Sequence, residues 1–448
     1  LECVFWGLGG DGTIGANKNS IKIIGNNTGL GVQGYFSYDS KKSGGVTVSY
    51  LRFGEGDIRS AYLIQRPEFV ACHNESYVLK YDMLSGMKQG GVFLLNCEWD
   101  VSELDEKLPD DMKYQIAMKK LDFYIINAVH TGKEIGINGK INTILQSAFF
   151  KIVCDRYAKK YGLMSYEEAV GYMKEAARAS YEVKGQKIVE MNYRAIELGG
   201  ERLVHVTVPE NWRECPDKPV KRPSTMFQDR ECVMEYVENL QAFVNAHKGD
   251  ELPVSAFLPY ADGRQPSGTS AHEKRDFAVE LPEWLPENCI QCNRCSYVCP
   301  HAVIRPAVMD DVERKNAPSE MESIPMNGLP DRQFAIVVSA RDCTGCGSCA
   351  GVCPGKGGNK ALAMKPVEEY DKEKHQAEFD FAAPNPAQKE PSALPPFLRQ
   401  EGFYFVALGG AEKVGMNMYA YISDGRIIVV DAGYDFLNDD FPGMELGL

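Results

Sequence analysis

Eight cysteines between residues 289 and 353 are spaced as ligands of iron–sulfur clusters. They form two copies of one pattern, C-x2-C-x2-C-x3-C-P. Three thiolates two residues apart can hold three irons of one cubane, whereas the fourth lies beyond a turn and reaches the other cluster. The spacing therefore predicts two [4Fe–4S] clusters. One is expected at Cys289, Cys292, Cys295 and Cys353, and the other at Cys343, Cys346, Cys349 and Cys299.

Zinc and disulfides fit these cysteines less well. A tetrahedral zinc site usually takes its ligands as two C-x2-C pairs, whereas each copy here has three cysteines in register and a distant fourth. Disulfide frameworks are typical of short exported chains. This sequence has 448 residues and shows no basic stretch followed by the apolar core of an export signal. The pattern favours iron–sulfur clusters.

Composition indicates a soluble globular protein, with 44% hydrophobic and 25% charged residues. The length predicts about three domains. A net charge of −13 argues against nucleic acid as the main partner, because phosphate contacts need a basic surface. Without eighteen consecutive apolar residues, no membrane contact is expected, and the expected compartment is the cytoplasm. The first residue is Leu1, at the start of an apparent buried strand, so we expect a piece of a longer protein.

The elements ahead of the cysteines predict an α/β domain, because apolar strand candidates alternate with helix candidates. The strand candidates are residues 1–6, 31–36, 46–53, 60–64, 69–72 and 91–97. The helix candidates are residues 13–24, 77–87, 111–121, 141–161 and 165–183. Beyond this domain, residues 230–247 carry apolar side chains at helical spacing and predict an amphipathic helix.

A glycine-rich turn joins the first strand to the first helix. Gly7 to Gly12 matches G-x-G-x-x-G in the context of a dinucleotide loop, but the acidic residue expected about 20 positions later is not evident. A tight turn that lets strand and helix meet closely is the favoured alternative. Gly10-Asp11-Gly12 also resembles the opening of a thiamine-diphosphate magnesium motif, whose closing asparagine would come too early, at Asn26 or Asn27.

Two further sets of residues could bind or react. Lys41 and Lys42 lie among hydroxyls and glycines, so they could hold a phosphorylated ligand. The alternative for them is an exposed basic turn. Six cysteines outside the two motifs are predicted to be small buried residues. They are Cys3, Cys72, Cys97, Cys154, Cys215 and Cys232.

Several segments resemble the pyruvate:ferredoxin (or flavodoxin) oxidoreductase family. Residues 5–20, 38–45 and 69–74 are similar to its γ-type domain, and His272-Glu273-Lys274-Arg275 resembles its EKR domain. The two-cluster ferredoxin domain then follows in the family's order. The resemblance covers roughly residues 1–380 and is specific, because three domain signatures occur in the correct sequence.

The resemblance implies oxidative decarboxylation of pyruvate with coenzyme A, giving acetyl-CoA, carbon dioxide and electrons for ferredoxin or flavodoxin. It makes Lys41 and Lys42 candidates for the coenzyme A phosphates. The full enzyme would also need thiamine diphosphate and Mg²⁺. The thiamine-binding domains are not in this sequence, so no catalytic residue is assigned. Those missing domains and ferredoxin or flavodoxin are the expected partners, and the full enzyme is expected to be a homo-oligomer.

The fold class expected is an α/β domain, a small α+β linker domain and a bacterial two-cluster ferredoxin-like α+β domain, ending in a short β-rich fragment. The expected bounds are a γ-type domain at 1–212, an EKR-type linker domain at 213–280, the ferredoxin domain at 281–380, a Pro/Ala-rich linker at 381–400 and the fragment at 401–448. The stretch between the two cysteine motifs is expected to be a loop over one cluster or an attachment to its neighbours.

The fragment at 401–448 resembles the first strands of a ribonuclease J-type metallo-β-lactamase fold, without the zinc-binding histidines. The leading hypothesis is thus a piece of the oxidoreductase. The alternatives are a stand-alone iron–sulfur electron carrier whose first domain docks it to a partner and, less favoured, a ribonuclease fragment. The genomic reading frame on both sides would separate them.

Overall fold

The computed structural model describes residues 1–39, 45–137, 141–216, 231–266, 268–382, 403–409, 418–423 and 426–430. The chain divides into two compact units, Leu1–Ala383 and Pro384–Leu448. Within the described ranges, no helix combines the length and the apolar character needed to cross a membrane.

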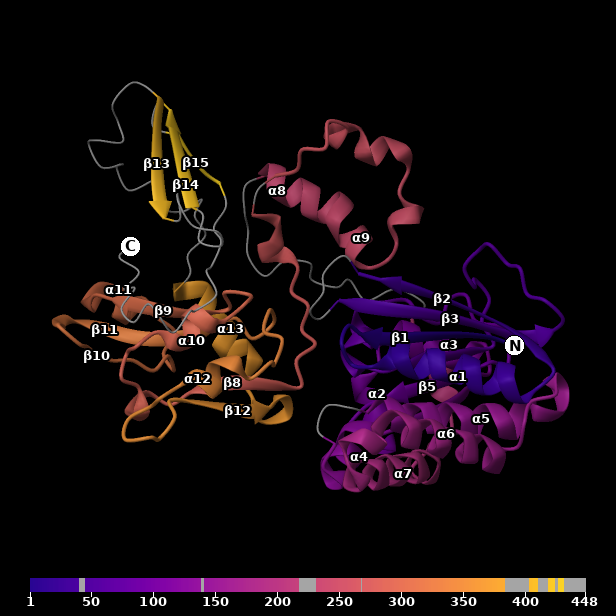
Figure 1. The fold of residues 1–448 in the computed structure, drawn as a ribbon. Helices are drawn as coiled ribbons and strands as arrows, with labels where there is room; N and C mark the ends of the chain where they lie inside the picture. Colours follow the sequence, from indigo (N-terminus) through magenta and orange to yellow (C-terminus); the bar gives the residue numbers. More distant parts are fainter. Residues whose placement is uncertain are drawn as a thin grey trace. The chain divides into compact units, whose positions relative to one another are not determined.

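The first domain is built on a seven-stranded sheet with the order β2-β3-β1-β4-β5-β6-β7. Figure 1 labels its strands β1, β2, β3 and β5. Its central strands β1, β4, β5 and β6 are parallel, and β3 and β7 run antiparallel to their neighbours. The short strands β4 and β5 are buried throughout, as expected when helices cover both faces of a sheet. The bounds are β1 Glu2–Leu8, β2 Leu30–Tyr38, β3 Val46–Glu55, β4 Phe69–Cys72, β5 Val92–Asn96, β6 Asp122–Ile126 and β7 Val204–Val206.

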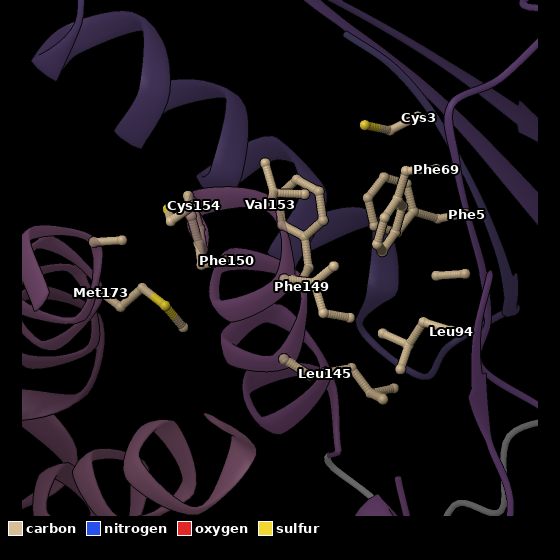
Figure 2. Close-up of a cluster of buried hydrophobic side chains, with 14 of the residues drawn as sticks. Cys3, Phe5, Phe69, Leu94, Leu145, Phe149, Phe150, Val153, Cys154 and Met173 are labelled. Atoms are coloured by element: carbon tan, nitrogen blue, oxygen red, sulfur yellow. The ribbon is translucent and has the colours of Figure 1, made fainter. Parts of the chain in front are cut away.

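Helices cover both faces of this sheet. One face packs against the long helices α1, α5, α6 and α7. Figure 2 shows the centre of that core, where the Phe149 ring lies 5.1 Å from Phe5 and 5.2 Å from Phe69, measured between ring centroids. The other face packs against α2 and α3. The bounds are α1 Thr13–Asn27, α2 Leu104–Lys107, α3 Asp110–Met118, α4 Ala128–Ile135, α5 Asn142–Tyr161, α6 Tyr166–Tyr181 and α7 Gln186–Glu201.

Most of the predicted elements of this domain are confirmed, and two are wrong. Residues 60–64 form a loop, whose Ser60 and Tyr62 carbonyls accept hydrogen bonds from the side chains of Gln33 and Arg52 instead of pairing in the sheet. Residues 77–87 contain only the end of a 3-10 turn, Glu75–Leu79. The chain then bends so that a Cβ at Gly86 would lie 2.3 Å from the Gln65 carbonyl oxygen, a contact that side chains exclude.

Burial of the six remaining cysteines follows the prediction in part. Cys3, Cys72, Cys97 and Cys154 are buried, Cys215 is half-buried and Cys232 is exposed, so the prediction is wrong for Cys232. Desolvation raises the pKa of Cys97 and of Cys154 to about 12. These two thiols therefore stay protonated at neutral pH and are poor nucleophiles.

The segment after the first domain is helical. α8 (Glu231–Tyr236) continues through one π-helical turn, Val237–Gln241, into α9 (Ala242–Asn245), which confirms the amphipathic helix. Val233 and Val237 lie on its buried side. Among the described residues of 213–280, Glu280 is the only one in a strand, and the expected α+β character of this linker stays a prediction. Its 3-10 turns, Gly249–Glu251, Val254–Tyr260 and Thr269–His272, stand among prolines and glycines that interrupt extended pairing.

The cysteine motifs lie in a ferredoxin-like region with two small sheets, β12-β8 and β10-β11-β9. Leu281, Phe334 and Leu362 are among its most buried core side chains. The expected loop between the motifs is instead a folded insertion that contains α11 and β10, an outer strand of the three-stranded sheet. The bounds are β8 Glu280–Trp284, α10 Arg294–Val298, β9 Ile304–Met309, α11 Asp311–Asn316, β10 Ile324–Met326, β11 Leu329–Val338, α12 Ser348–Val352, β12 Leu362–Pro366 and α13 Lys372–Ala382.

The second unit contains an antiparallel sheet, β13-β14-β15. Its strands are β13 Phe403–Gly409, β14 Met418–Ser423 and β15 Arg426–Val430, which agrees with the short β-rich fragment expected there. The expected linker at 381–400 lies outside the described residues, apart from its first two.

Candidate metal centres

Strand pairing brings opposite ends of the two cysteine motifs together. The first motif lies between β8 and β9, and the second lies between β11 and β12. β8 pairs with β12, and β9 pairs with β11, both antiparallel. The Leu285 N–H donates to the Ala361 carbonyl at 2.9 Å, and the Ser339 N–H donates to the Val303 carbonyl at 2.8 Å. The start of each motif is therefore held next to the end of the other.

Two cavities lie between the motifs, and each is lined by four cysteines. The first is lined by Cys289, Cys292, Cys295 and Cys353. The second is lined by Cys299, Cys343, Cys346 and Cys349. Each cavity thus receives three cysteines from one motif and the fourth from the other. Within the described ranges, no three Cys, His, Asp or Glu side chains are grouped to hold a single metal ion.

The two motif loops have the same backbone shape. Each has two residues of positive φ at matching positions, Gln291 (61°) and Asn293 (57°) in the first, and Gly345 (67°) and Gly347 (71°) in the second. Each loop then enters a five-residue helix, α10 or α12. Because glycine adopts positive φ without steric cost, only the first loop carries this strain.

Gly345 and Gly347 give a matched pair of substitutions. Alanine at either position would be strained by about 1–2 kcal/mol, because φ is positive. At Gly345 the new Cβ would also lie 2.8 Å from the Glu280 carbonyl oxygen, whereas nothing lies within 4 Å of a Cβ at Gly347. We expect Gly345→Ala to lower the free energy of unfolding by about 1–3 kcal/mol more than Gly347→Ala. Urea denaturation of the two variants, followed by circular dichroism, measures the difference, and equal losses would contradict it.

Backbone amides point at cysteine sulfurs in both motifs. The N–H of Gln291 donates to Cys289 Sγ at 3.4 Å, and the N–H of Gly345 donates to Cys343 Sγ at the same distance. The Ala361 N–H, at the start of β12, donates to Cys353 Sγ at 3.2 Å. Such donors stabilise negative charge on sulfur. The cavities therefore suit a group with anionic thiolate ligands.

The thiols differ in how easily they ionise. Burial raises the pKa of Cys295 to about 12 and that of Cys343 to about 11. Burial also acts on Cys346, but the Ser348 hydroxyl, the Ser348 amide and the Thr344 hydroxyl outweigh it and lower the pKa of this thiol. Cys346 Sγ lies 3.5 Å from Ser348 Oγ. Sequence reasoning identified the cysteines but missed these hydroxyls, which are visible in the string T-G-C-G-S.

Trp284, at the end of β8, lines the first cavity. Its side chain is buried, with 7% of the residue exposed, and its indole nitrogen has no hydrogen-bond acceptor among the described residues. A buried indole N–H usually finds a partner. A group with acceptor atoms in this cavity, such as the sulfurs of an iron–sulfur cluster, fits this donor.

The insertion between the motifs is fastened to the first motif loop by one side chain. Gln291 Nε2 donates to the Pro325 carbonyl, and its Oε1 accepts from the Asn327 N–H, both at 2.8 Å. The tip of the insertion, at β10, therefore contacts the loop that carries Cys289 and Cys292. The expectation that the stretch lies over one cluster stays a prediction.

The glycine-rich turn of the first domain closes on itself. Asp11 accepts hydrogen bonds from the Leu8 N–H at 2.9 Å and from the Thr13 N–H at 2.7 Å. A Cβ at Gly7 would lie 2.7 Å from Thr13 Oγ1. These contacts support the tight-turn interpretation over a dinucleotide loop, because Asp11 already occupies the start of α1. Lys41 and Lys42 lie outside the described residues.

His73 lies beneath this turn. Its Nδ1 is 2.7 Å from Thr13 Oγ1, which also donates to Asp11 at 2.8 Å. Burial lowers the pKa of His73 to about 4, although the charge of Asp11 acts in the opposite direction. The imidazole is therefore neutral at neutral pH.

Three family models match separate parts of the chain. Residues 2–202 match "Pyruvate ferredoxin/flavodoxin oxidoreductase", residues 226–278 match the EKR domain, described as a "Domain of unknown function", and residues 288–357 match "4Fe-4S dicluster domain". These three models end at residue 357, so the ribonuclease resemblance of the last residues has no support among them.

Curated relatives match over most of the chain. A pyruvate-flavodoxin oxidoreductase of Enterobacter agglomerans is 47% identical over 83% of this chain and 30% of its own length. A pyruvate:ferredoxin oxidoreductase of Moorella thermoacetica is 47% identical over 87% of this chain and 32% of its own length. The chain thus spans about a third of these relatives. A solved structure, the pyruvate oxidoreductase subunit PORC of Thermotoga maritima, is 17% identical with a TM-score of 0.36, over 46% of this chain and 98% of that one.

Proposed function

We propose that this chain is part of a pyruvate oxidoreductase. The support is that it matches a pyruvate ferredoxin/flavodoxin oxidoreductase domain, an EKR domain and a 4Fe-4S dicluster domain. That enzyme decarboxylates pyruvate oxidatively with coenzyme A to acetyl-CoA and carbon dioxide. The ferredoxin-like region passes the released electrons to ferredoxin or flavodoxin. The curated relatives are named pyruvate-flavodoxin oxidoreductase and pyruvate:ferredoxin oxidoreductase, which supports pyruvate as substrate and flavodoxin or ferredoxin as acceptor.

The observation that carries the proposal is the pair of cavities with three cysteines from one motif and one from the other. We assign Cys289, Cys292, Cys295 and Cys353 to one [4Fe–4S] cluster, and Cys343, Cys346, Cys349 and Cys299 to the second. This is the ligation expected of the C-x2-C-x2-C-x3-C-P pattern. The amides of Gln291, Gly345 and Ala361 supply hydrogen bonds to the ligand sulfurs.

The chain's own residues bind and orient the clusters. When bound, the clusters would act as one-electron carriers. Thiolates are the ligands, so binding releases protons from thiols such as Cys295, whose pKa of about 12 keeps it protonated beforehand. Lys41 and Lys42 are proposed to bind the coenzyme A phosphates from the connection between β2 and β3. Thiamine diphosphate and Mg²⁺ are proposed to bind domains of the enzyme outside this sequence, and those domains are proposed partners of this chain. The full enzyme is proposed to be a homo-oligomer.

Metal content tests the cluster assignment. We expect the anaerobically reconstituted chain to hold about eight irons and eight acid-labile sulfides, and its reduced form to pass electrons to flavodoxin, followed by the absorbance of the flavin. Cys292→Ala should lose roughly half of the iron. Cys232→Ala is the matched control, because Cys232 is exposed and outside both motifs, and it should lose none. Zinc in place of iron, without sulfide, would contradict the proposal.

A further inference from the structure

Side chains that are not ligands also reach the two cavities, and they differ between them. At the first cavity the candidate donor is the buried indole N–H of Trp284. At the second it is the Ser348 hydroxyl, 3.5 Å from Cys346 Sγ. In the first motif, Arg294 stands at the position of Ser348, and Ile290 stands at the position of Thr344. The two cavities thus have different side-chain hydrogen-bond donors, although the two motif loops have the same backbone shape.

We propose that Trp284 and Ser348 set the reduction potentials of the two clusters separately, Trp284 for the cluster at Cys289, Cys292, Cys295 and Cys353, and Ser348 for the other. The inference rests on the proposed function, because it needs both clusters to be bound. Trp284 donates its indole N–H to a sulfur of the first cluster, and Ser348 donates its O–H to the Cys346 thiolate.

The physical reason is electrostatic. A cluster gains one negative charge when it takes up one electron, so a hydrogen bond to its sulfurs stabilises the reduced form more than the oxidised form and raises the potential. A buried polar group without a partner costs free energy. The Trp284 N–H lacks an acceptor in the described protein, so an acceptor in the cavity that this residue lines removes that cost.

Ser348 is held where its hydroxyl can act. It is the first residue of α12, directly after Gly347 at φ 71°, and it also gives its backbone amide to Cys346. Once Cys346 is a thiolate ligand it has no proton to donate, so the hydroxyl is the donor in this pair. Thr344 adds a second hydroxyl to the same sulfur.

The test is a redox titration of the fully reconstituted chain, with each cluster followed by its electron paramagnetic resonance signal. We expect Ser348→Ala to lower the potential of the second cluster alone. At a fixed solution potential the ratio of reduced to oxidised cluster should fall roughly threefold to tenfold, which is about 30–60 mV for one electron. Ser348→Thr keeps a hydroxyl and should stay close to the parent chain.

For Trp284 the informative change removes the N–H and keeps the ring. Benzothienylalanine at this position has sulfur in place of the N–H, and we expect it to lower the potential of the first cluster alone by a similar factor. Trp284→Phe should act in the same direction if the cluster is retained. Ser296→Ala is the control, because Ser296 gives Cys295 its backbone amide, which alanine keeps.

The outcomes are separable. Absence of iron and sulfide in the parent chain would refute the proposed function itself. Two bound clusters whose potentials do not change in Ser348→Ala and in the benzothienylalanine chain would refute only the present inference. A shift of the wrong cluster in either chain would also refute it. If Ser348→Ala lost the second cluster, the comparison of Arg294→Ser with Arg294→Ala would test the inference instead. The serine hydroxyl introduced at position 294 should raise the potential of the first cluster, and equal potentials in the two variants would refute the inference.

Discussion

Removing Cys299 is expected to destroy chiefly the cluster held by the second motif, although Cys299 belongs to the first. The cavity that Cys299 lines is shared with Cys343, Cys346 and Cys349. Conversely, Cys353→Ala should damage the cluster at Cys289, Cys292 and Cys295, because Cys353 lines that cavity. The pairing of β9 with β11 and of β8 with β12 enforces the exchange.

Electron paramagnetic resonance of the reduced variants measures which signal is lost. Cys289→Ala and Cys343→Ala serve as references for the first and second cluster. If Cys299→Ala matched Cys289→Ala, the crossed ligation would be wrong. Should an alanine variant lose both clusters, Cys299→Ser offers an oxygen ligand instead. It should retain iron and alter the signal of the second cluster only.

The stability of the first domain should fall by about 3 kcal/mol as pH drops from about 6.5 to about 4, through His73. The pKa of this histidine is lowered from 6.5 to about 4 in the folded domain, because burial disfavours its charged form. The unfolded chain therefore binds a proton below about pH 6.5 that the folded chain refuses until about pH 4. Each pKa unit is worth about 1.4 kcal/mol, so the contribution is complete above pH 6.5 and lost on acidification.

Hydrogen exchange measures this dependence without assuming that the whole chain unfolds together. The free energy of opening of peptides from β4 and β5 should fall steeply between pH 6.5 and 4.5 in the parent chain and less steeply in His73→Gln. Asp11 and the other titratable groups are present in both chains, so the difference between the two slopes reports the contribution of His73. His130→Gln is the control, because the His130 side chain is 63% exposed. Parallel slopes in the parent and His73→Gln chains would show that His73 does not titrate as stated.

Local patterns in the sequence predicted the parts of the fold that are long or strongly apolar. The helix predicted at 141–161 is α5, Asn142–Tyr161, and the strand predicted at 69–72 is β4. Other elements were missed, among them β6 (Asp122–Ile126), α4 (Ala128–Ile135) and α7 (Gln186–Glu201). α4 and α7 are strongly amphipathic, so their sequences do carry a helical period that could have predicted them. β6 follows α3 almost directly, so no turn signal separates the two.

The metal site shows the same division. The cysteine spacing predicts which thiols belong together, because ligand geometry fixes that spacing. It cannot predict that Trp284 lines the first cavity, since that depends on β8 pairing with β12 some eighty residues away in sequence. The Gln291 contacts with Pro325 and Asn327 were equally out of reach, because they join a motif loop to a folded insertion.

The exchange of strands between the two motifs also bears on how the protein is made. A ribosome releases β8 and the first motif long before β12, the only partner strand of β8 in the described structure. Until Cys353 and β12 have emerged, the nascent chain exposes four thiols with no complete site for them. The cellular machinery that delivers iron and sulfide must therefore wait for the end of this region, and oxidants reaching the nascent chain earlier would find its thiols unprotected.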